Sequence, residues 1–222
     1  RNGAGKSTLV KLICGLFQPT KGEILVNGRK INEYNCQEYY TLISAVFQKI
    51  NPIAFTIFEF VASADPERKS AREDAVKAME AAGIYEKIRS LPGGMDTHLM
   101  KGVYDDGVDF SGGEMQKLVL ARAIYKDGSI LILDEPTAAM DPIAESRLYQ
   151  QYGDLTRGKT SIYISHRFAS TRFCDRIVLL ENGVIEELGT HEELMEKNGS
   201  YAYMFGVQSR YYKDGKEGCT AT

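Results

Sequence analysis

The stretch Arg1-Asn2-Gly3-Ala4-Gly5-Lys6-Ser7-Thr8 opens the chain and runs directly into Leu9, the first of several apolar residues at helical spacing. Its glycines let successive backbone N–H groups face one point, which also faces the positive end of the following helix. The stretch matches the phosphate-binding pattern G-x-x-x-x-G-K-[ST], with the opening glycine one position before residue 1. We therefore expect the chain to begin inside this motif, as a piece of a longer protein.

Each part of this motif has its own chemical use. Lys6 supplies a mobile positive charge for the outer phosphates of a nucleotide, and Ser7 offers a hydroxyl to Mg²⁺. A plain glycine-rich turn before a helix is the alternative interpretation. The predicted phosphate-binding residues are Asn2, Gly3, Ala4, Gly5, Lys6, Ser7 and Thr8.

A second stretch, Ile130-Leu131-Ile132-Leu133-Asp134-Glu135, is an apolar strand that ends in two acids. In α/β sheets, ligands bind at the carboxyl ends of the strands, so both carboxylates would lie at the ligand edge. Asp134 would hold Mg²⁺ directly or through water, and Glu135 would orient and deprotonate an attacking water. The alternative is an acidic strand end that faces solvent.

A third stretch, Phe110-Ser111-Gly112-Gly113-Glu114, precedes apolar residues at helical spacing. A hydroxyl and two glycines at a helix start form another anion site, although the same residues could simply relax the start of a helix. One molecule rarely places two such helix starts on a single nucleotide. We therefore expect the second one to act on the nucleotide of a partner.

The composition is that of an ordinary soluble globular protein. The 222 residues are 43% hydrophobic and 26% charged with a net charge of −3, which excludes collagen-like, low-complexity and wholly disordered classes. This charge gives no general attraction to nucleic acid. The four cysteines are far apart and contain no C-x-x-C pair, so we interpret them as reduced thiols rather than a disulfide or zinc framework. No apolar run approaches the roughly 18 residues that span a bilayer.

Strands alternate with helices along the chain, which indicates an α/β sheet. Short apolar runs predict buried strands at 42–48, 130–133 and 161–165, and Asn-Gly pairs predict hairpins at 22–32 and 176–188. The charged, alanine-containing region from about 59 to 100 predicts a helical insert. Thr190 and Glu193 form a capping-box pattern that predicts a helix from residue 191.

The order of these motifs, together with three further residues, resembles that of ATP-binding cassette (ABC) ATPases. Gln48 lies 42 residues after Lys6 and 63 before Ser111, and His166 lies 31 after Glu135. Asp141 completes the set. The resemblance covers residues 1 to about 208. It implies a P-loop NTPase of α/β class, with a RecA-like core, a mostly parallel sheet, a helical subdomain and antiparallel β hairpins. The implied core is 1–58 with 118–222, and the implied helical subdomain, carrying the signature motif, is 59–117.

The resemblance also implies roles for individual residues and two ligands, ATP and Mg²⁺. Gln48 resembles the Q-loop glutamine that senses Mg²⁺ and the γ-phosphate, and His166 resembles the switch histidine that hydrogen-bonds that phosphate. We interpret His98 and His191 as surface residues. The implied catalytic residues are Glu135, His166, Gln48 and Lys6; the implied metal ligands are Ser7, Gln48 and Asp134; and the implied nucleotide contacts beyond the loop are Ser111, Gly112, Gly113, Glu114 and Asp141.

Several segments resemble the exporter branch of this family. They are Phe55-Thr56-Ile57-Phe58-Glu59, Ser165 to Thr171, and Gly189 to Leu194. The implied function is to power export through a transmembrane domain, fused or separate, by ATP-dependent dimerisation with a second nucleotide-binding domain at the cytoplasmic face of the membrane. A soluble ABC ATPase that acts on ribosomes or DNA is the alternative, and a pure nucleotide-dependent dimerisation module is a third. We expect no nucleic-acid partner.

Two departures from the family pattern bear on function. Glu114 stands where the family usually has glutamine, and an acceptor-only carboxylate there would repel incoming phosphate. We therefore expect slower hydrolysis than in a Glu114→Gln variant. Asp106 stands where exporters often have a basic residue, which puts conventional communication with the membrane domain in doubt.

Overall fold

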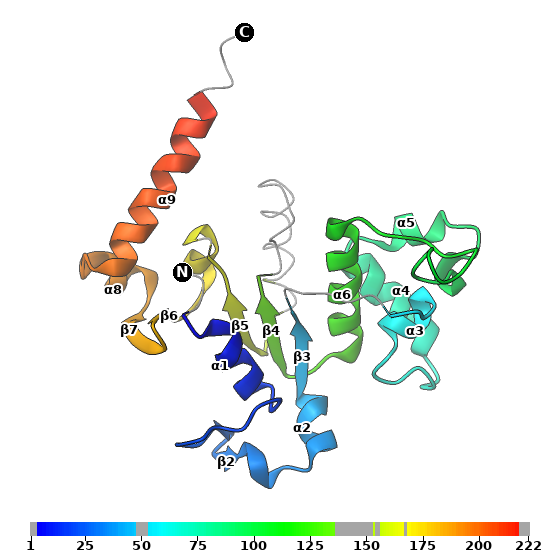
Figure 1. Cartoon of the computed structure of the whole chain (residues 1–222), viewed down its shortest axis with the longest axis horizontal. Helices are drawn as coiled ribbons and strands as arrows, with labels where there is room; N and C mark the ends of the chain where they lie inside the picture. The colour runs from blue at the N-terminus through cyan, green and yellow to red at the C-terminus, as the bar shows by residue number, and fades with distance from the viewer. Residues whose placement is uncertain (1–3, 48–52, 136–152, 154–155, 167, 218–222) are drawn as a thin grey trace. The chain divides into compact units, whose positions relative to one another are not determined.

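The computed structural model describes residues 4–47, 53–135, 153, 156–166 and 168–217 (Figure 1). The chain divides into two compact units. One unit consists of residues 1–17 with 164–222, and the other of residues 18–163.

The unit 18–163 is built on a three-stranded sheet in the order β3-β4-β5. Strand β3 (Ile43–Val46) pairs in parallel with β4 (Ile130–Asp134), and β5 (Thr160–Ile164) follows. Ile132 and Leu133 have no exposed surface. Continuous apolar runs of this kind suit strands covered on both faces. The predicted burial is confirmed for β3 and β4, whereas the third predicted strand is present as β5 but only its last residue, Ile164, is buried.

The first predicted hairpin lies in the same unit. It consists of β1 (Leu25–Val26) and β2 (Arg29–Lys30), which pair antiparallel. The turn residues Asn27 and Gly28 have φ angles of 52° and 78°, the left-handed conformation that a two-residue hairpin turn requires. The segment that follows contains a 3₁₀ turn, η1 (Ile31–Glu33), and helix α2 (Cys36–Leu42).

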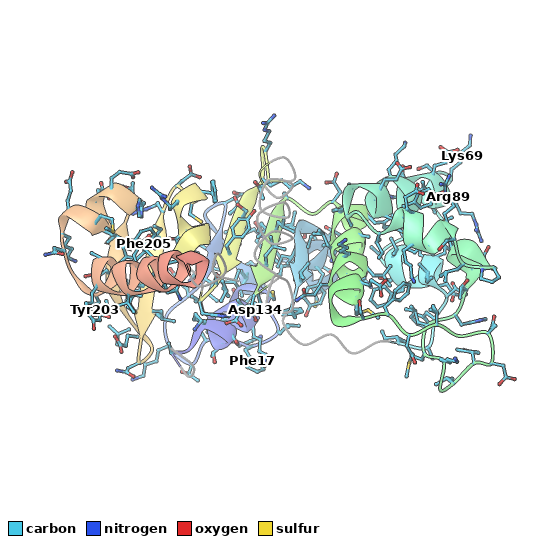
Figure 2. All side chains as sticks on the ribbon, turned by 90° about the horizontal axis from the view of Figure 1, so that it is seen from above. Phe17, Lys69, Arg89, Asp134, Tyr203 and Phe205 are labelled. Atoms are coloured by element: carbon cyan, nitrogen blue, oxygen red, sulfur yellow. The ribbon has the colours of Figure 1, made fainter. Side chains whose placement is uncertain are left out.

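The helical insert is confirmed between β3 and β4. Its helices share a core with the sheet that includes Phe60, Met79, Leu99 and Leu118, all at most 2% exposed. Figure 2 shows Asp134 within the strands of this unit and Lys69 and Arg89 on its helical part. The elements are α3 (Ile57–Val61), α4 (Ala71–Ala81), α5 (Tyr85–Arg89), η2 (Gly94–Asp96) and α6 (Gly112–Lys126).

The other unit contains the first helix and the end of the chain. Its core joins Ile177, Leu194 and Tyr201, all buried. On the last helix, Phe205 packs partly against this core, whereas Tyr203 is 74% exposed (Figure 2). The elements are α1 (Lys6–Ile13), η3 (Phe168–Phe173), β6 (Ile177–Glu181), β7 (Val184–Gly189), α8 (His191–Glu196) and α9 (Ser200–Glu217).

Two further sequence predictions are confirmed in this unit. Strands β6 and β7 pair antiparallel around Asn182 and Gly183, which have φ angles of 50° and 77°. Thr190 caps α8 in a full capping box with Glu193. Within the described residues of both units, no helix is long and apolar enough to cross a membrane. The predicted boundary between a core and a helical subdomain at 59–117 stays a prediction.

The connection from α6 to β4 depends on a glycine. A Cβ atom on Gly128 would lie 2.7 Å from the Leu42 carbonyl oxygen and 2.8 Å from the Ser44 nitrogen. The Gly128 N–H donates to the Ser44 hydroxyl at 2.9 Å. The two backbones approach too closely for any side chain at this position.

We predict that Gly128→Ala lowers the free energy of unfolding by about 2–3 kcal/mol, because the added methyl group must push two backbone segments apart. Denaturant unfolding measures this change. Gly102→Ala is the matched control, since a methyl group on Gly102 would have no neighbouring atom within 4 Å. Equal stability of both variants would contradict the close approach.

Candidate functional site

The described part of the phosphate loop has the backbone that the motif predicts. Gly5 adopts a φ of 93° immediately before α1, a left-handed conformation that favours glycine. Ala4 is buried, and its carbonyl accepts a hydrogen bond of 3.2 Å from the Gly183 N–H in the β6–β7 turn. No side chain caps α1, and its first turn carries no acid. The start of α1 therefore suits an anion. Asn2 and Gly3 lie outside the described residues.

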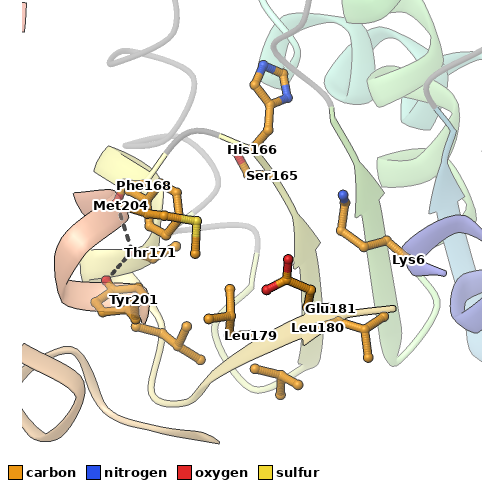
Figure 3. Close-up of a pocket in the computed structure, with 12 residues that line it drawn as sticks. Lys6, Ser165, His166, Phe168, Thr171, Leu179, Leu180, Glu181, Tyr201 and Met204 are labelled. Carbon is orange, nitrogen blue, oxygen red and sulfur yellow. Dashed lines mark hydrogen bonds between the residues drawn. The ribbon is translucent and has the colours of Figure 1, made fainter. Parts of the chain in front are cut away.

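A cavity of about 120 Å³ in the same unit brings Lys6 and His166 together. Lys6 and Glu181 lie on one side of it in Figure 3, with Thr171 and Tyr201 on the other. This volume is below the roughly 300–1,000 Å³ of pockets that hold a whole ligand. The two predicted catalytic residues are 160 positions apart in sequence, so only the fold places them on one cavity.

Helix α9 fixes the backbone around His166. The Gln208 amide donates to the His166 carbonyl at 2.7 Å, and its oxygen accepts the Phe168 N–H at 2.8 Å. Nearby, the Tyr201 hydroxyl lies 2.6 Å from that of Thr171. The sequence analysis missed Gln208 and Tyr201. Their only sequence signal is a polar or aromatic side chain within a helix, which does not reveal a partner 30 or 40 residues away.

The acidic end of β4 carries two carboxylates with different surroundings. Asp134 is 6% exposed, whereas Glu135 is half-buried and has a φ of 49°. A left-handed conformation is uncommon for residues other than glycine and is frequent at functional sites. The strand end therefore turns sharply at Glu135, immediately after the buried Asp134.

The described residues contain no group of three or more acidic, histidine or cysteine side chains that could hold a metal ion. The predicted Mg²⁺ ligands stay a prediction. Mg²⁺ in phosphate sites uses one or two protein oxygens together with phosphate oxygens and water. Of the predicted ligands, Ser7 lies in the first turn of α1 and Asp134 ends β4.

The third motif begins α6. The Ser111 hydroxyl accepts the Glu114 N–H at 3.3 Å, and the Glu114 carboxylate accepts the Ser111 N–H at 2.9 Å. These two bonds form a capping box. The hydrogen bond from the Ser111 N–H lowers the pKa of the Glu114 carboxyl below its usual value. Gly112 and Gly113 complete the first turn without bulk that would cover it.

Within the unit 18–163, α6 runs antiparallel to β4, because only a short turn connects them (Figure 1). Ser111 at the start of α6 and Asp134 at the end of β4 therefore lie toward the same end of this unit. Predicted residues Gln48 and Asp141 lie outside the described residues.

The two histidines interpreted as surface residues are partly exposed, and each ring has a side-chain partner. His98 is half-buried, stacks on Tyr104 with ring centroids 4.0 Å apart, and has its Nδ1 3.2 Å from the Asp106 carboxylate. His191 is also half-buried, with its Nδ1 2.9 Å from the Tyr201 hydroxyl. Both rings have structural partners that sequence spacing could not reveal. Asp106, at the position often basic in exporters, pairs with His98.

Comparison with known proteins fits this arrangement of motifs. The family model described as "ABC transporter" matches residues 1–138. The chain belongs to the ABC transporter family. It has the ATPase fold of that family, so the predicted α/β P-loop NTPase class is confirmed.

Relatives and a solved structure extend this match over the chain. The chain is 39% identical over 209 residues to an ATP-dependent lipid A-core flippase of Burkholderia pseudomallei (strain 1710b), covering 93% of this chain and 34% of the relative. It is 38% identical to the flippase of Chromohalobacter salexigens, covering 94% and 35%. A bacterial Atm1-family ABC exporter with ATP bound is similar with a TM-score of 0.83 and 30% identity, covering 94% of this chain and 35% of that one. The chain thus spans about a third of the length of these proteins, and its predicted resemblance to exporter-type cassettes is confirmed.

We predict that Gln208→Ala frees the backbone around His166, because both hydrogen bonds from α9 are lost. The measurement is hydrogen exchange at the Phe168 amide, which should become faster by about 5-fold or more. Val207→Ala serves as a control on the same helix, since Val207 is exposed. An unchanged exchange rate in Gln208→Ala would show that the two bonds do not hold this segment.

Proposed function

We propose that the chain is the nucleotide-binding domain of an ABC exporter, which binds and hydrolyses ATP to power transport through a membrane domain. The observation that supports this proposal most strongly is the cavity shared by Lys6 and His166 beside the uncapped start of α1. A lysine and a histidine that line one cavity, beside a helix start without a side-chain cap, form a suitable site for a terminal phosphate.

In this proposal the unit of residues 1–17 and 164–222 binds the nucleotide. The N–H groups at the start of α1 face the phosphates, and Lys6 neutralises charge on the outer ones. Ser7 and Thr8 lie in the first turn of the same helix. Gln208 holds the backbone of His166, so that the imidazole meets the terminal phosphate from a fixed position.

In this proposal the two acids at the end of β4, Asp134 and Glu135, serve hydrolysis. Glu135 orients the attacking water and accepts its proton. By resemblance to the family, Asp134 and Ser7 would each be a ligand of Mg²⁺. Bound Mg²⁺ would neutralise part of the phosphate charge. Gln48 joins this set by resemblance to the family. Asp134 is well suited to its role because burial at the strand end limits its motion.

The site is completed by a second copy or a related domain. Ser111, Gly112 and Gly113 at the start of α6 meet the nucleotide bound by the partner, and Asp141 contacts the opposite subunit. Neither subunit alone contains a complete site, so ATP holds the two together, and its hydrolysis loosens them.

The names of the relatives as flippases support a membrane domain, as does their length, which is about three times that of this chain. We place the chain at the cytoplasmic face of the membrane, where ATP is available. A soluble ATPase acting on ribosomes or DNA is less well supported, because the net charge is −3 and the similar proteins described above are flippases and an exporter.

We predict that Glu135→Gln lowers ATP turnover by about 10²-fold or more, because loss of a general base has this effect. ATP binding should persist, since the amide is neutral and of similar size. Turnover by the complete protein in proteoliposomes and binding of a fluorescent ATP analogue measure the two properties. Glu181→Gln is the comparison variant, because Glu181 lines the cavity without an assigned catalytic role. Turnover that survives in Glu135→Gln would remove this residue from its role.

The shared site can be tested by complementation. Lys6→Ala and Ser111→Arg should each abolish turnover alone. Mixed subunits should recover a measurable part of it, because a heterodimer contains one site with both residues intact. Failure of every mixture, with dimers present by size-exclusion chromatography, would contradict a site shared between two copies.

A further inference from the structure

The hydroxyl of Ser111 makes a contact in addition to the two bonds that define its capping box. Besides accepting the Glu114 N–H, it donates its hydrogen to Oε2 of the Glu114 carboxylate at 2.9 Å. The same Oε2 atom accepts the Ser111 backbone N–H at 2.9 Å. A serine hydroxyl has one hydrogen, so Ser111 cannot donate to any other acceptor in this arrangement.

The carboxylate is held in its charged form by its surroundings. Lys87 on α5 lies 3.8 Å from Oε1, and Lys117 lies on the same helix as Glu114. The Lys117 ammonium donates to the Gly83 carbonyl at 3.3 Å. The bond from the Ser111 N–H and these cations lower the pKa of Glu114. The group is therefore ionised at neutral pH, accepts hydrogen bonds and donates none.

We propose that the Glu114 carboxylate acts as a latch: it holds the Ser111 hydroxyl in a hydrogen bond. This bond must break before the serine can donate to the phosphate of a partner's nucleotide. This inference rests on the proposed function, in which Ser111 meets that nucleotide. Opening the latch removes a charge-assisted hydrogen bond, which is about twice as strong as a neutral one. Glu114 thus acts as a positioning residue that sets how much ATP is needed to close the shared site.

Lys87 affects the balance between the closed and the open latch. The carboxylate uses one oxygen for Ser111 and presents the other to the Lys87 ammonium. When the serine turns away, Lys87 is the cation nearest to the released charge. It stabilises the open latch more than the closed one, because only the open latch leaves the carboxylate without the Ser111 hydroxyl.

Capping boxes occur elsewhere in the chain, and at α3 the Thr56 hydroxyl donates to the Glu59 carboxylate at 2.9 Å, as the Ser111 hydroxyl does to Glu114. Thr56 with Glu59 and Thr190 with Glu193 form capping boxes at α3 and α8. The Glu193 carboxylate accepts the Thr190 N–H at 2.9 Å, just as Glu114 accepts that of Ser111. The cap at α8 belongs to no predicted nucleotide site. It therefore provides a matched control that separates helix stability from latching.

The test compares Glu114→Gln and Glu114→Asp in the complete protein in proteoliposomes, with MgATP as the ligand. Glutamine keeps the capping box but makes a weaker neutral bond to Ser111. Aspartate keeps the charge but is one methylene too short to reach the serine hydroxyl. We expect both variants to lower the KM for ATP by about 5-fold. If Glu114 acts only by repelling phosphate through its charge, KM will fall in Glu114→Gln but not in Glu114→Asp. That result would overturn the latch.

Lys87 gives a second, independent measurement. Lys87→Met should raise the KM for ATP by about 2–3-fold in the wild-type background, as expected for a partly exposed pair. It should change nothing in the Glu114→Gln background, because no charge is released there. Lys77→Met is the control, since Lys77 lies 3.8 Å from Asp74, away from the signature helix start. An equal effect of Lys87→Met in both backgrounds would overturn the coupling.

Failure of the latch differs from failure of the proposed function. Glu193→Gln should leave KM unchanged while removing a comparable charged cap. If the wild-type protein hydrolyses ATP and Glu135→Gln does not, but both Glu114 variants match the wild type in KM, the latch alone is wrong. If the wild-type protein shows no ATP turnover in membranes, the proposed function itself fails.

Discussion

The parallel pairing of β4 with β3 is the constraint on which the unit 18–163 depends. Ile132 pairs with Ala45 and has no exposed surface, and Leu131 and Leu133 are at most 5% exposed. Burial of these side chains removes apolar area from water and fixes the strand end to within one residue, since a shift in register would turn every side chain to the other face. Asp134 is buried at that end, and Glu135 follows in a left-handed turn. The predicted general base and metal ligand thus owe their position to an apolar strand.

Turn geometry has the same role in the other unit. Gly5 and Gly183 both adopt positive φ angles, and the Gly183 N–H bonds the carbonyl before Gly5. The β6–β7 turn therefore supports the phosphate loop at the start of α1. Because glycine adopts this conformation without steric cost, two chain segments far apart in sequence can meet closely at this point. The loop proposed to receive the phosphates is held by backbone contacts, which leaves the start of α1 open to a ligand.

Sequence reasoning predicted the parts of the molecule whose signals are local. The β4 run, the Asn-Gly hairpins and the Thr190 cap depend on neighbours within a few residues, and each is present. Contacts between segments far apart in the sequence could not be predicted. Gln208 reaches back 42 residues to His166, and nothing in the helical pattern of α9 distinguishes it from other polar residues. The roles of individual site residues come from the family resemblance, and Gln48 and Asp141 lie outside the described residues.

Ser111 illustrates why a motif does not by itself determine a site's state. The sequence pattern S-x-x-E is both a helix cap and, in this chain, the start of a predicted nucleotide contact. A stabilising cap favours the hydroxyl on the helix, whereas a nucleotide requires it to turn outward. The two uses compete for one hydrogen atom, so the free energy that holds α6 at its first turn opposes closure of the shared site. Replacing the usual glutamine by Glu114 strengthens the cap through its charge, and Lys87 offsets part of that gain because it also stabilises the released carboxylate. Stability of one helix start and the ATP concentration at which two domains close are therefore coupled through a single side chain.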